Sequence, residues 1–216
     1  ERFRDVVIVG AGAAGGAAAA HLSRSGHDVV LLERDAEPRI KPCGGGMAAS
    51  VQKWFPFSLE PAVEQVVRQV DFSWCLGDPV VAELPGEAPF WIVRRERLDQ
   101  LLTDQAKQAG AECCAGVTVT DISRDNDHWS VTAADGQRWR TRSVVIADGS
   151  ASPWPQRLGL GAKRVQTATT MSVRLEGQGR LKNGTTRFEF GLVKQGFAWA
   201  FPVAGGVNIG CLLYTS

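Results

Sequence analysis

The residues that most clearly indicate chemistry form a glycine-rich segment at 10–15 with the spacing G-x-G-x-x-G. In such a segment Gly10 permits a tight turn, and Gly12 lets the backbone approach a pyrophosphate group closely. Gly15 lets the following helix pack tightly against a strand. The pattern predicts a dinucleotide site if a strand precedes it and a helix follows it.

The elements expected around this segment have the order that such a site requires. The β-branched run at 5–9 predicts a buried parallel strand, Ala13–Arg24 predicts a helix, and 27–33 predicts a second buried strand. Ala13 and Ala14 open the helix, whose first N–H groups and positive dipole end attract an anion. Strand, turn, helix and strand together form the unit of a doubly wound α/β sheet.

An acidic residue ends the second predicted strand. Glu33 follows Gly15 by 18 residues, near the position at which a carboxylate accepts hydrogen bonds from ribose hydroxyls. Its negative charge also disfavours a 2′-phosphate at the same place. The site is therefore predicted to bind FAD or NAD rather than NADP.

The composition is that of a globular protein and excludes several other classes. Of the 216 residues, 44% are hydrophobic and 22% are charged, which argues against intrinsic disorder. The net charge of +1 gives no reason to expect a nucleic-acid partner, and no apolar run is long enough for a spanning helix. We expect mostly reduced cysteines, no metal site and a cytoplasmic location, because the cysteines are odd in number and lack zinc-knuckle spacing and no signal peptide is visible.

The rest of the chain predicts one further helix and many short strands. The helix is expected at 96–108, where leucines recur at helical spacing and a glycine follows at 110. Strands are expected at 66–76, 80–84, 88–93, 117–122, 129–133, 137–140 and 143–147, with a turn at 125–127. An antiparallel sheet is expected from 169–175, 186–190, 197–201 and 207–212, with turns at Asn183-Gly184 and Gly205-Gly206.

Three further motifs resemble those of known FAD-binding proteins. Arg34, directly after Glu33, is similar to the Glu-Arg pair of the glutathione-reductase-like superfamily. Arg95 lies in a segment that resembles the superfamily pattern of an Arg, then Leu-Asp, then Leu, in which the Arg reaches the cofactor. Asp148 and Gly149 resemble the Asp-Gly motif of class A flavoprotein monooxygenases and their relatives, which lies near the FAD pyrophosphate and ribose.

Two segments resemble a narrower family. Lys-Pro-Cys-Gly-Gly-Gly-Met at 41–47 resembles a segment of the geranylgeranyl reductase family, and Gly-Phe-Ala-Trp-Ala-Phe-Pro at 196–202 resembles that family's Tyr-x-Trp-x-Phe-Pro motif. Phe197 stands where the family usually has Tyr. Flavin-dependent halogenases carry a related motif with Trp and Ile where this chain has Phe197 and Phe201, so the reductases fit better.

This resemblance implies a Rossmann-like FAD-binding domain of the glutathione-reductase-like α/β class with an antiparallel β-sheet substrate domain. It implies that non-covalent FAD, reduced by an external donor such as NAD(P)H, saturates carbon–carbon double bonds of an isoprenoid chain. The residues then expected at the cofactor are Gly10, Gly12, Ala13, Ala14, Gly15, Glu33, Arg34, Cys43, Gly44, Gly45, Arg95, Val119, Asp148 and Gly149.

The substrate side is less closely defined. Phe197, Trp199 and Phe201 share one face of a predicted strand, so they are expected either to line an apolar pocket or simply to pack. Cys43 is the one candidate for a catalytic role, and the alternative is a small buried side chain. We expect the FAD domain at 1–65 and 94–155 and the substrate domain at 66–93 and 156–216.

Two alternative functions remain open at this point. One is an FAD-dependent monooxygenase or halogenase, and the other is an FAD-binding fragment without catalysis. Related proteins carry a late Gly-Asp motif that this chain lacks after Gly149, so we expect a C-terminally truncated protein. The expected partner is a small isoprenoid molecule and not a nucleic acid, and a lipid substrate leaves peripheral contact with a membrane open.

Overall fold

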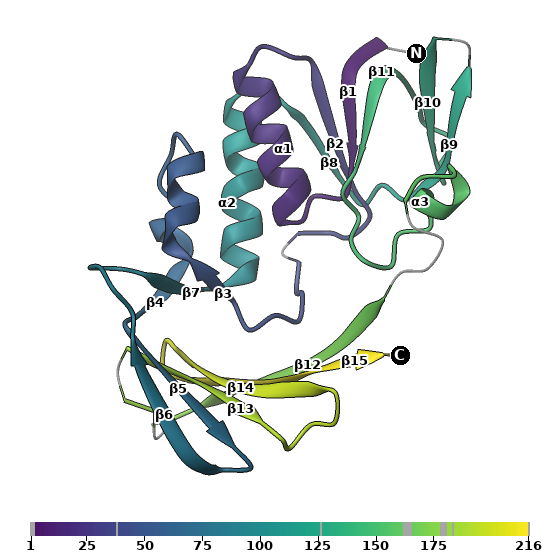
Figure 1. Ribbon diagram of the computed structural model, residues 1–216. Coiled ribbons are helices and arrows are strands. Elements are labelled where there is room, and N and C mark those ends of the chain that lie inside the picture. Colours follow the sequence, from purple (N-terminus) through teal and green to yellow (C-terminus); the bar gives the residue numbers. More distant parts are fainter. Residues whose placement is uncertain are drawn as a thin grey trace. The chain divides into compact units, whose positions relative to one another are not determined.

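The computed structural model describes residues 3–37, 39–125, 127–161, 166–177, 181–182 and 184–215. Packing divides the chain into two compact units. Unit 1 comprises Glu1–Arg39 and Asp99–Lys163, and unit 2 comprises Ile40–Leu98 and Arg164–Ser216. Each unit contains its own sheets (Figure 1). The assignment of cofactor and substrate roles to the predicted domain ranges stays a prediction.

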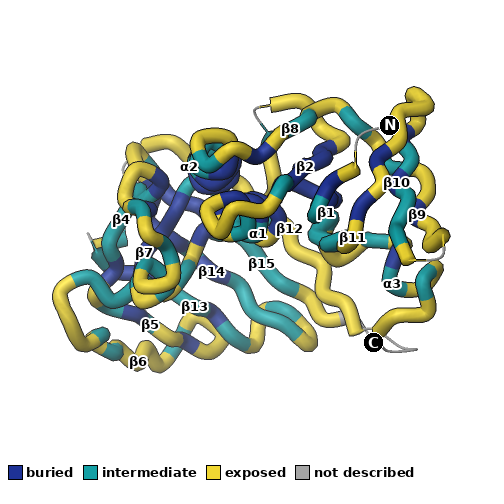
Figure 2. Tube along the Cα trace, turned by 90° about the horizontal axis from the view of Figure 1, so that it is seen from above, coloured by how far each residue is buried: buried dark blue, intermediate teal, exposed yellow. Residues whose placement is uncertain are grey.

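Unit 1 is built on a six-stranded sheet with the strand order β8–β2–β1–β11–β10–β9. Four strands are parallel, namely β8 (Glu112–Ala115), β2 (Val29–Glu33), β1 (Phe3–Val9) and β11 (Arg138–Ile146). Two strands continue the sheet in antiparallel fashion, namely β10 (His128–Ala133) and β9 (Val119–Asp125). The predicted α/β fold with a Rossmann-like domain is therefore confirmed. Figure 2 shows β2 buried along its length, as its apolar run predicts for a strand covered on both faces.

Two helices accompany this sheet. Helix α1 (Ala13–Arg24) has the predicted bounds, and the chain turns after it at Gly26, whose φ is +86°. Helix α2 (Arg95–Gln108) begins one residue before the predicted start. A Cβ added at Gly16 of α1 would lie 2.9 Å from the Cβ of Leu102 of α2, so this glycine lets the two helices approach closely.

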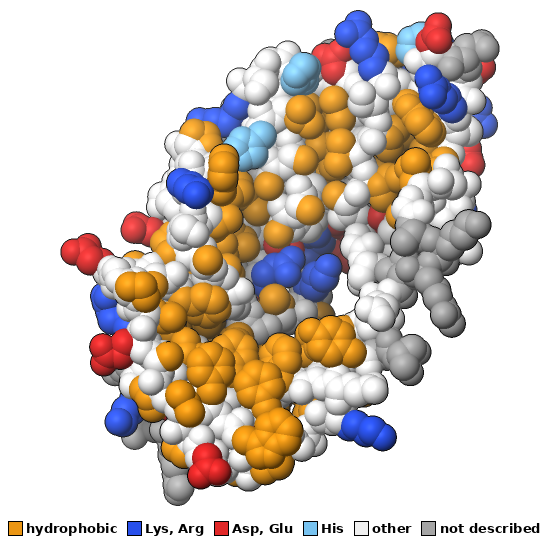
Figure 3. Space-filling view, in the orientation of Figure 1, with side chains coloured by type: hydrophobic (Ala, Val, Ile, Leu, Met, Phe, Trp, Pro, Cys, Tyr) orange, Lys and Arg blue, Asp and Glu red, His pale blue; other side chains and the backbone are white. Residues whose placement is uncertain are grey.

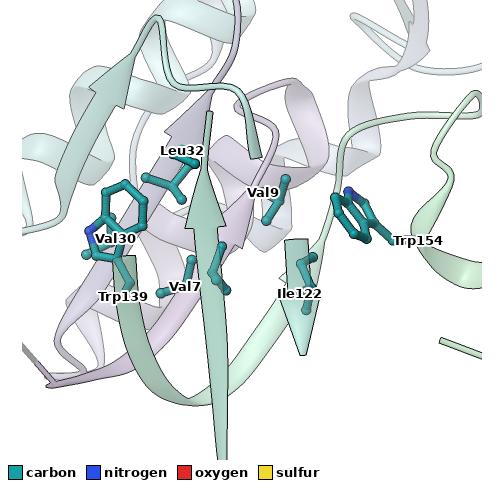
Figure 4. Close-up of a cluster of buried hydrophobic side chains, with 9 residues drawn as sticks. Val7, Val9, Val30, Leu32, Ile122, Trp139 and Trp154 are labelled. Carbon is teal, nitrogen blue, oxygen red and sulfur yellow. The ribbon is translucent and has the colours of Figure 1, made fainter. Parts of the chain in front are cut away.

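The core of unit 1 combines residues from the parallel and the antiparallel strands. Figure 4 shows side chains of this buried cluster, which comprises Val7, Val9, Val30, Leu32, Ile122, Val131, Ala133, Trp139 and Trp154. The short helix α3 (Trp154–Arg157) was not predicted, and its Trp154 is only 4% exposed. Burial of this large ring ties α3 to the sheet.

Unit 2 contains a large and a small sheet. The large sheet has the order β12 (Thr167–Glu176), β15 (Gly206–Thr215), β14 (Gly196–Val203), β13 (Thr185–Phe190), β5 (Gln69–Trp74) and β6 (Gly77–Glu83). The small sheet has the order β3 (Gly46–Ala48), β7 (Phe90–Val93) and β4 (Val63–Val67), with 3-10 turns at Ala49–Trp54 and Glu60–Ala62. The large sheet is antiparallel as predicted, except that β13 and β5 run parallel.

Several elements differ from those expected. The predicted strand at 66–76 is two strands, because the chain passes from the small sheet to the large one at Arg68. There the N–H of Arg68 donates to the carbonyl oxygen of Gly184 at 2.8 Å, and its own carbonyl oxygen accepts from Leu84 at 2.7 Å. The two strands expected at 137–140 and 143–147 are one, β11. Strands β3 and β8 were not predicted, and Asn126 and Asn183 of the expected turns lie outside the described residues.

Candidate functional site

The turn between β1 and α1 has the geometry that its glycines predict. Gly10 has a φ of +94°, which favours glycine, and a Cβ there would lie 2.6 Å from the carbonyl oxygen of Ala147. A Cβ at Gly15 would lie 1.8 Å from the carbonyl oxygen of Gly10. Gly12 differs, because no atom lies within 4 Å of a Cβ placed there. Gly10 and Gly15 thus close the turn, whereas the space beside Gly12 is open.

The start of α1 presents backbone donors beside that open space. Gly12 is the N-cap residue and provides no side-chain cap, and the N–H of Gly16 donates to its carbonyl oxygen at 2.8 Å. The N–H groups of Ala13 and Ala14 precede this first helical bond and have no acceptor within the helix. The first turn of α1 contains no acidic residue. The positive end of the helix dipole therefore favours a bound anion here.

Glu33 is held against the same turn. Its carboxylate accepts from the N–H of Ala11 at 2.7 Å and from the N–H of Asp35 at 3.0 Å, and the residue is 9% exposed. The carboxyl end of β2 thus brings the predicted ribose acceptor next to the glycine turn. The two backbone bonds fix its orientation.

A guanidinium that the motifs did not reveal lies beside Glu33. Nη1 of Arg39 donates to Oε2 of Glu33 at 2.8 Å, and its Nη2 donates to the carbonyl oxygen of Ala11. The guanidinium also lies 3.7 Å from the carboxylate of Asp99 on α2. The side chains of Arg39, Glu33 and Asp99 are only 13%, 11% and 4% exposed. Arg39 therefore links the glycine turn, the acid after β2 and α2 through nearly buried charges.

Arg34, the arginine that the sequence indicated, lies elsewhere. Its side chain is 74% exposed and its Nε lies 3.7 Å from Asp35. Its contact with a cofactor stays a prediction. The segment between β2 and Cys43 has no periodicity that separates one arginine from the other, so only the folded chain distinguishes Arg34 from Arg39.

The Asp-Gly motif after β11 adjoins the glycine turn. A Cβ at Gly10 would lie 2.6 Å from the Cα of Asp148, and the N–H of Ala147 donates to the carbonyl oxygen of Val9 at 2.8 Å. Oδ1 of Asp148 is buried and has no hydrogen-bond partner in the described part of the chain. Gly149 has a φ of +97°. A buried acceptor without a partner calls for an explanation, and a donor on a bound ligand would provide one.

These features of unit 1 fit a dinucleotide. The open space at Gly12 and the N–H groups of Ala13 and Ala14 suit a pyrophosphate, and Glu33 suits ribose hydroxyls. Val119, also expected at the cofactor, begins β9 and packs partly buried against the cluster of Figure 4. Its contact stays a prediction.

Other expected contacts belong to unit 2. Arg95 begins α2, and Cys43 is a half-buried free thiol whose Sγ accepts from the N–H of Gly45 at 3.4 Å. The predicted cofactor contacts of Arg95, Cys43, Gly44 and Gly45 stay predictions. Within unit 2, the rings that Gly44 approaches are side chains of the protein, not a flavin ring. A Cβ at Gly44 would lie 2.8 Å from Cε2 of Phe201 and 2.9 Å from Nε1 of Trp199.

The three aromatic residues predicted as pocket walls differ in burial. Trp199 and Phe201 are each 6% exposed and belong to a core cluster with Val67 and Ile92, whereas Phe197 is only partly buried. Their packing is established, and their contact with a substrate stays a prediction.

Further phenylalanines extend this aromatic face. The ring of Phe197 lies 5.8 Å from that of Phe188 and 5.9 Å from that of Phe190, and Phe72 stacks on Phe188 at 5.8 Å. Hydrophobic side chains gather on the face of unit 2 seen in Figure 3.

Other kinds of site find no support in the described residues. The five cysteines, at 43, 75, 113, 114 and 211, are free thiols, and burial raises the pKa of Cys113 to about 11. Among the residues described, no three His, Cys, Asp or Glu side chains are grouped so as to hold a metal ion. No helix in that part of the chain has the length and apolar character to cross a membrane.

Comparison with known proteins identifies the dinucleotide. Residues 5–70 match the family model described as FAD dependent oxidoreductase. The matched segment contains the glycine turn, α1, β2 and most of β1. FAD is accordingly the cofactor of the glycine turn, and solved structures with this fold include a halogenase in complex with FAD.

Curated relatives resemble the FAD-binding chain over most of its length. A menaquinone reductase of Mycobacterium tuberculosis is 32% identical over 223 residues, which cover 95% of this chain and 54% of that protein. A probable electron transfer flavoprotein-quinone oxidoreductase of Escherichia coli, YgcN, is 30% identical over 79% of this chain and 41% of its own length. The chain spans about half the length of the curated relatives it matches.

Solved structures share the fold at lower identity. A geranylgeranyl bacteriochlorophyll reductase-like protein of Thermoplasma acidophilum superposes with a TM-score of 0.86 at 20% identity, over 98% of this chain and 57% of that one. The halogenase PltM, solved with phloroglucinol and FAD, gives a TM-score of 0.77 at 18% identity, over 97% of this chain and 51% of that one. At these identities the likeness concerns the fold alone.

Proposed function

We propose that the protein is an FAD-dependent oxidoreductase that reduces carbon–carbon double bonds of an isoprenoid chain. The contact between the Cys-Gly-Gly-Gly segment and the Trp199–Phe201 pair carries this proposal, because it joins the two reductase-like motifs in one unit. The 32% identical relative is named a menaquinone reductase, and menaquinone carries an isoprenoid tail. That name supports a quinone with such a tail as the substrate class.

The chain's own residues have separate roles in such a reaction. The glycine turn and the start of α1 bind the pyrophosphate, and Glu33 orients the adenosine ribose. The aromatic face of unit 2 offers an apolar surface that excludes water from a prenyl chain. Bound FAD, kept reduced by an external donor of the NAD(P)H class, would supply a hydride to the double bond, and a proton would complete the saturated bond.

Anaerobic single-turnover measurements test the proposal. The protein is loaded with FAD, reduced with dithionite, freed of excess reductant and mixed with a polyprenyl quinone or geranylgeranyl diphosphate. We expect the flavin absorbance near 450 nm to return without O2 and the prenyl product to gain two mass units per bond. Flavin reoxidation with a quinone but no change in prenyl mass would instead indicate reduction of the quinone ring and contradict the proposal.

A monooxygenase or halogenase is the second candidate, because a halogenase with FAD shares the fold. In that case reduced flavin would be reoxidised only with O2, and an aromatic substrate would gain oxygen or halide. Bound FAD that is reoxidised by neither class of substrate would favour an FAD-binding protein without catalysis.

A further inference from the structure

Trp199 is fixed by a buried hydrogen bond that neither motif required. Its Nε1 donates to Oδ1 of Asn208 at 2.9 Å, and the two residues are only 6% and 5% exposed. The register of β14 and β15 pairs Phe201 with Asn208 and Trp199 with Gly210. Asn208 is therefore the diagonal neighbour of Trp199 on the same face of the sheet.

Gly210 fixes the plane of the same ring. A Cβ at Gly210 would lie 2.2 Å from Cζ2 and 2.6 Å from Cε2 of Trp199. The indole thus lies directly against the β15 backbone, where any side chain larger than hydrogen would displace it. The hydrogen bond to Asn208 and the close approach to the backbone at Gly210 together restrict the position of the Trp199 ring.

The Cys-Gly-Gly-Gly segment rests on that fixed ring. Gly44 lies so close to Nε1 of Trp199 and to Phe201 that a Cβ would come within 3.0 Å of both. A Cβ at Gly46 would lie 2.8 Å from Cζ of Phe90 and 3.2 Å from Cε2 of Phe201. The glycines of this segment therefore let its backbone lie on the aromatic rings.

The small sheet holds the segment from another side. The N–H of Val93 donates to the carbonyl oxygen of Gly45 at 2.8 Å. Gly45 has a φ of +81°, and a Cβ there would lie 2.2 Å from the carbonyl oxygen of Val93. Residues 43–46 are thus held between the β7 backbone and the Trp199 and Phe201 rings.

We propose that Asn208 is a positioning residue, which holds Trp199 so that residues 43–46 keep the conformation that contacts FAD. For the contact of this segment with FAD, the inference rests on the proposed function. The effect of Asn208 on the conformation of the segment does not depend on that function. Asn208 acts through Trp199 and touches neither cofactor nor substrate. Without its acceptor the buried indole N–H has no partner, which favours a different ring position.

Labelling of Cys43 reports on the segment in the absence of any cofactor. The test variant is Asn208→Ala, and Asn208→Asp keeps an acceptor oxygen and should restore the wild-type rate in part. The matched control is Thr186→Val, which removes a different buried side-chain hydrogen bond of the same sheet, the one to the carbonyl oxygen of Ala200. Peptide mass spectrometry after timed alkylation with iodoacetamide separates Cys43 from the other four thiols.

We expect Asn208→Ala to raise the alkylation rate of Cys43 about fivefold or more and to weaken FAD binding about tenfold, as loss of one buried hydrogen bond allows. Thr186→Val should change neither. An unchanged Cys43 rate in Asn208→Ala, or an equal increase in Thr186→Val, would overturn the inference. A faster Cys43 rate with unchanged FAD affinity would overturn the contact of residues 43–46 with FAD, whereas the proposed function is overturned only by the single-turnover measurement described above. If Asn208→Ala does not fold, Trp199→Phe removes the donor instead, and the same two outcomes apply.

Discussion

Arg39 is the charge on which the adenosine side of the site most depends, and Arg39→Ala tests this dependence. The substitution removes the hydrogen bonds to Glu33 and to the Ala11 carbonyl oxygen, and it removes the guanidinium that lies 3.7 Å from the carboxylate of Asp99. These two side chains are 11% and 4% exposed, so water replaces little of the lost interaction. Removal of one partner of a buried ion pair costs about 3–5 kcal/mol.

Because Arg39 itself is 13% exposed, the lower end of that range applies, and we expect a loss of about 3 kcal/mol in the free energy of unfolding. Urea denaturation followed by tryptophan fluorescence measures the loss. Arg34→Ala is the matched control, because Arg34 is 74% exposed and its pair with Asp35 is worth less than about 1 kcal/mol.

A double-mutant cycle separates the pair energy from general damage. In Arg39→Ala combined with Glu33→Gln, the buried negative charge that Arg39 bonds is also gone, so the combined loss should be smaller than the sum of the single losses by about 1–3 kcal/mol. An Arg39→Ala loss below about 1 kcal/mol, or strictly additive effects in the cycle, would refute the network of buried charges.

Two further predictions follow from individual residues. Gly12→Ala should change the free energy of unfolding by less than about 1 kcal/mol but weaken FAD binding about tenfold or more. Gly15→Ala should instead prevent folding, because its Cβ would lie 1.8 Å from a carbonyl oxygen. Circular dichroism and FAD titration of both variants distinguish these effects. Hydrogen bonds from Ser73 and from the N–H of Leu76 hold the pKa of Glu189 below its ordinary value of 4.5, so unit 2 should lose stability as the pH falls below 4.5. Glu189→Gln should make the melting temperature less dependent on pH in that range. An equally steep dependence in the variant would contradict this.

The FAD-binding half of the fold could be predicted from local patterns. The apolar runs of β1 and β2, the alanine-rich α1 and the glycine spacing each depend on neighbours in sequence, and the parallel order follows from them. Glu33 reached its predicted place because β2 ends there. Strand β8 was missed because its four residues lie at the sheet edge and show no alternation that predicts a strand.

Features that depend on distant residues could not be predicted in this way. The break at Arg68 arises because the residues before it pair in the small sheet and the residues after it pair in the large sheet. The parallel pairing of β13 with β5 joins residues more than 110 positions apart. The roles of Arg39 and Asn208 become visible only in the folded chain, where they form hydrogen bonds with Glu33 and Trp199. The sequence indicated glycines that let a backbone approach a ring, but it could not show that Trp199 and Phe201 supply rings on which the segment rests.

Equilibrium titration of the purified protein with FAD, followed by quenching of flavin fluorescence, tests the function of the glycine turn most directly. We expect saturable binding of one FAD per chain, with 5′-AMP competing about tenfold or more better than adenosine 2′,5′-diphosphate, because the two differ only in the 2′-phosphate and the carboxylate of Glu33 repels it. Absence of saturable FAD binding, or equal competition by the two nucleotides, would contradict the account.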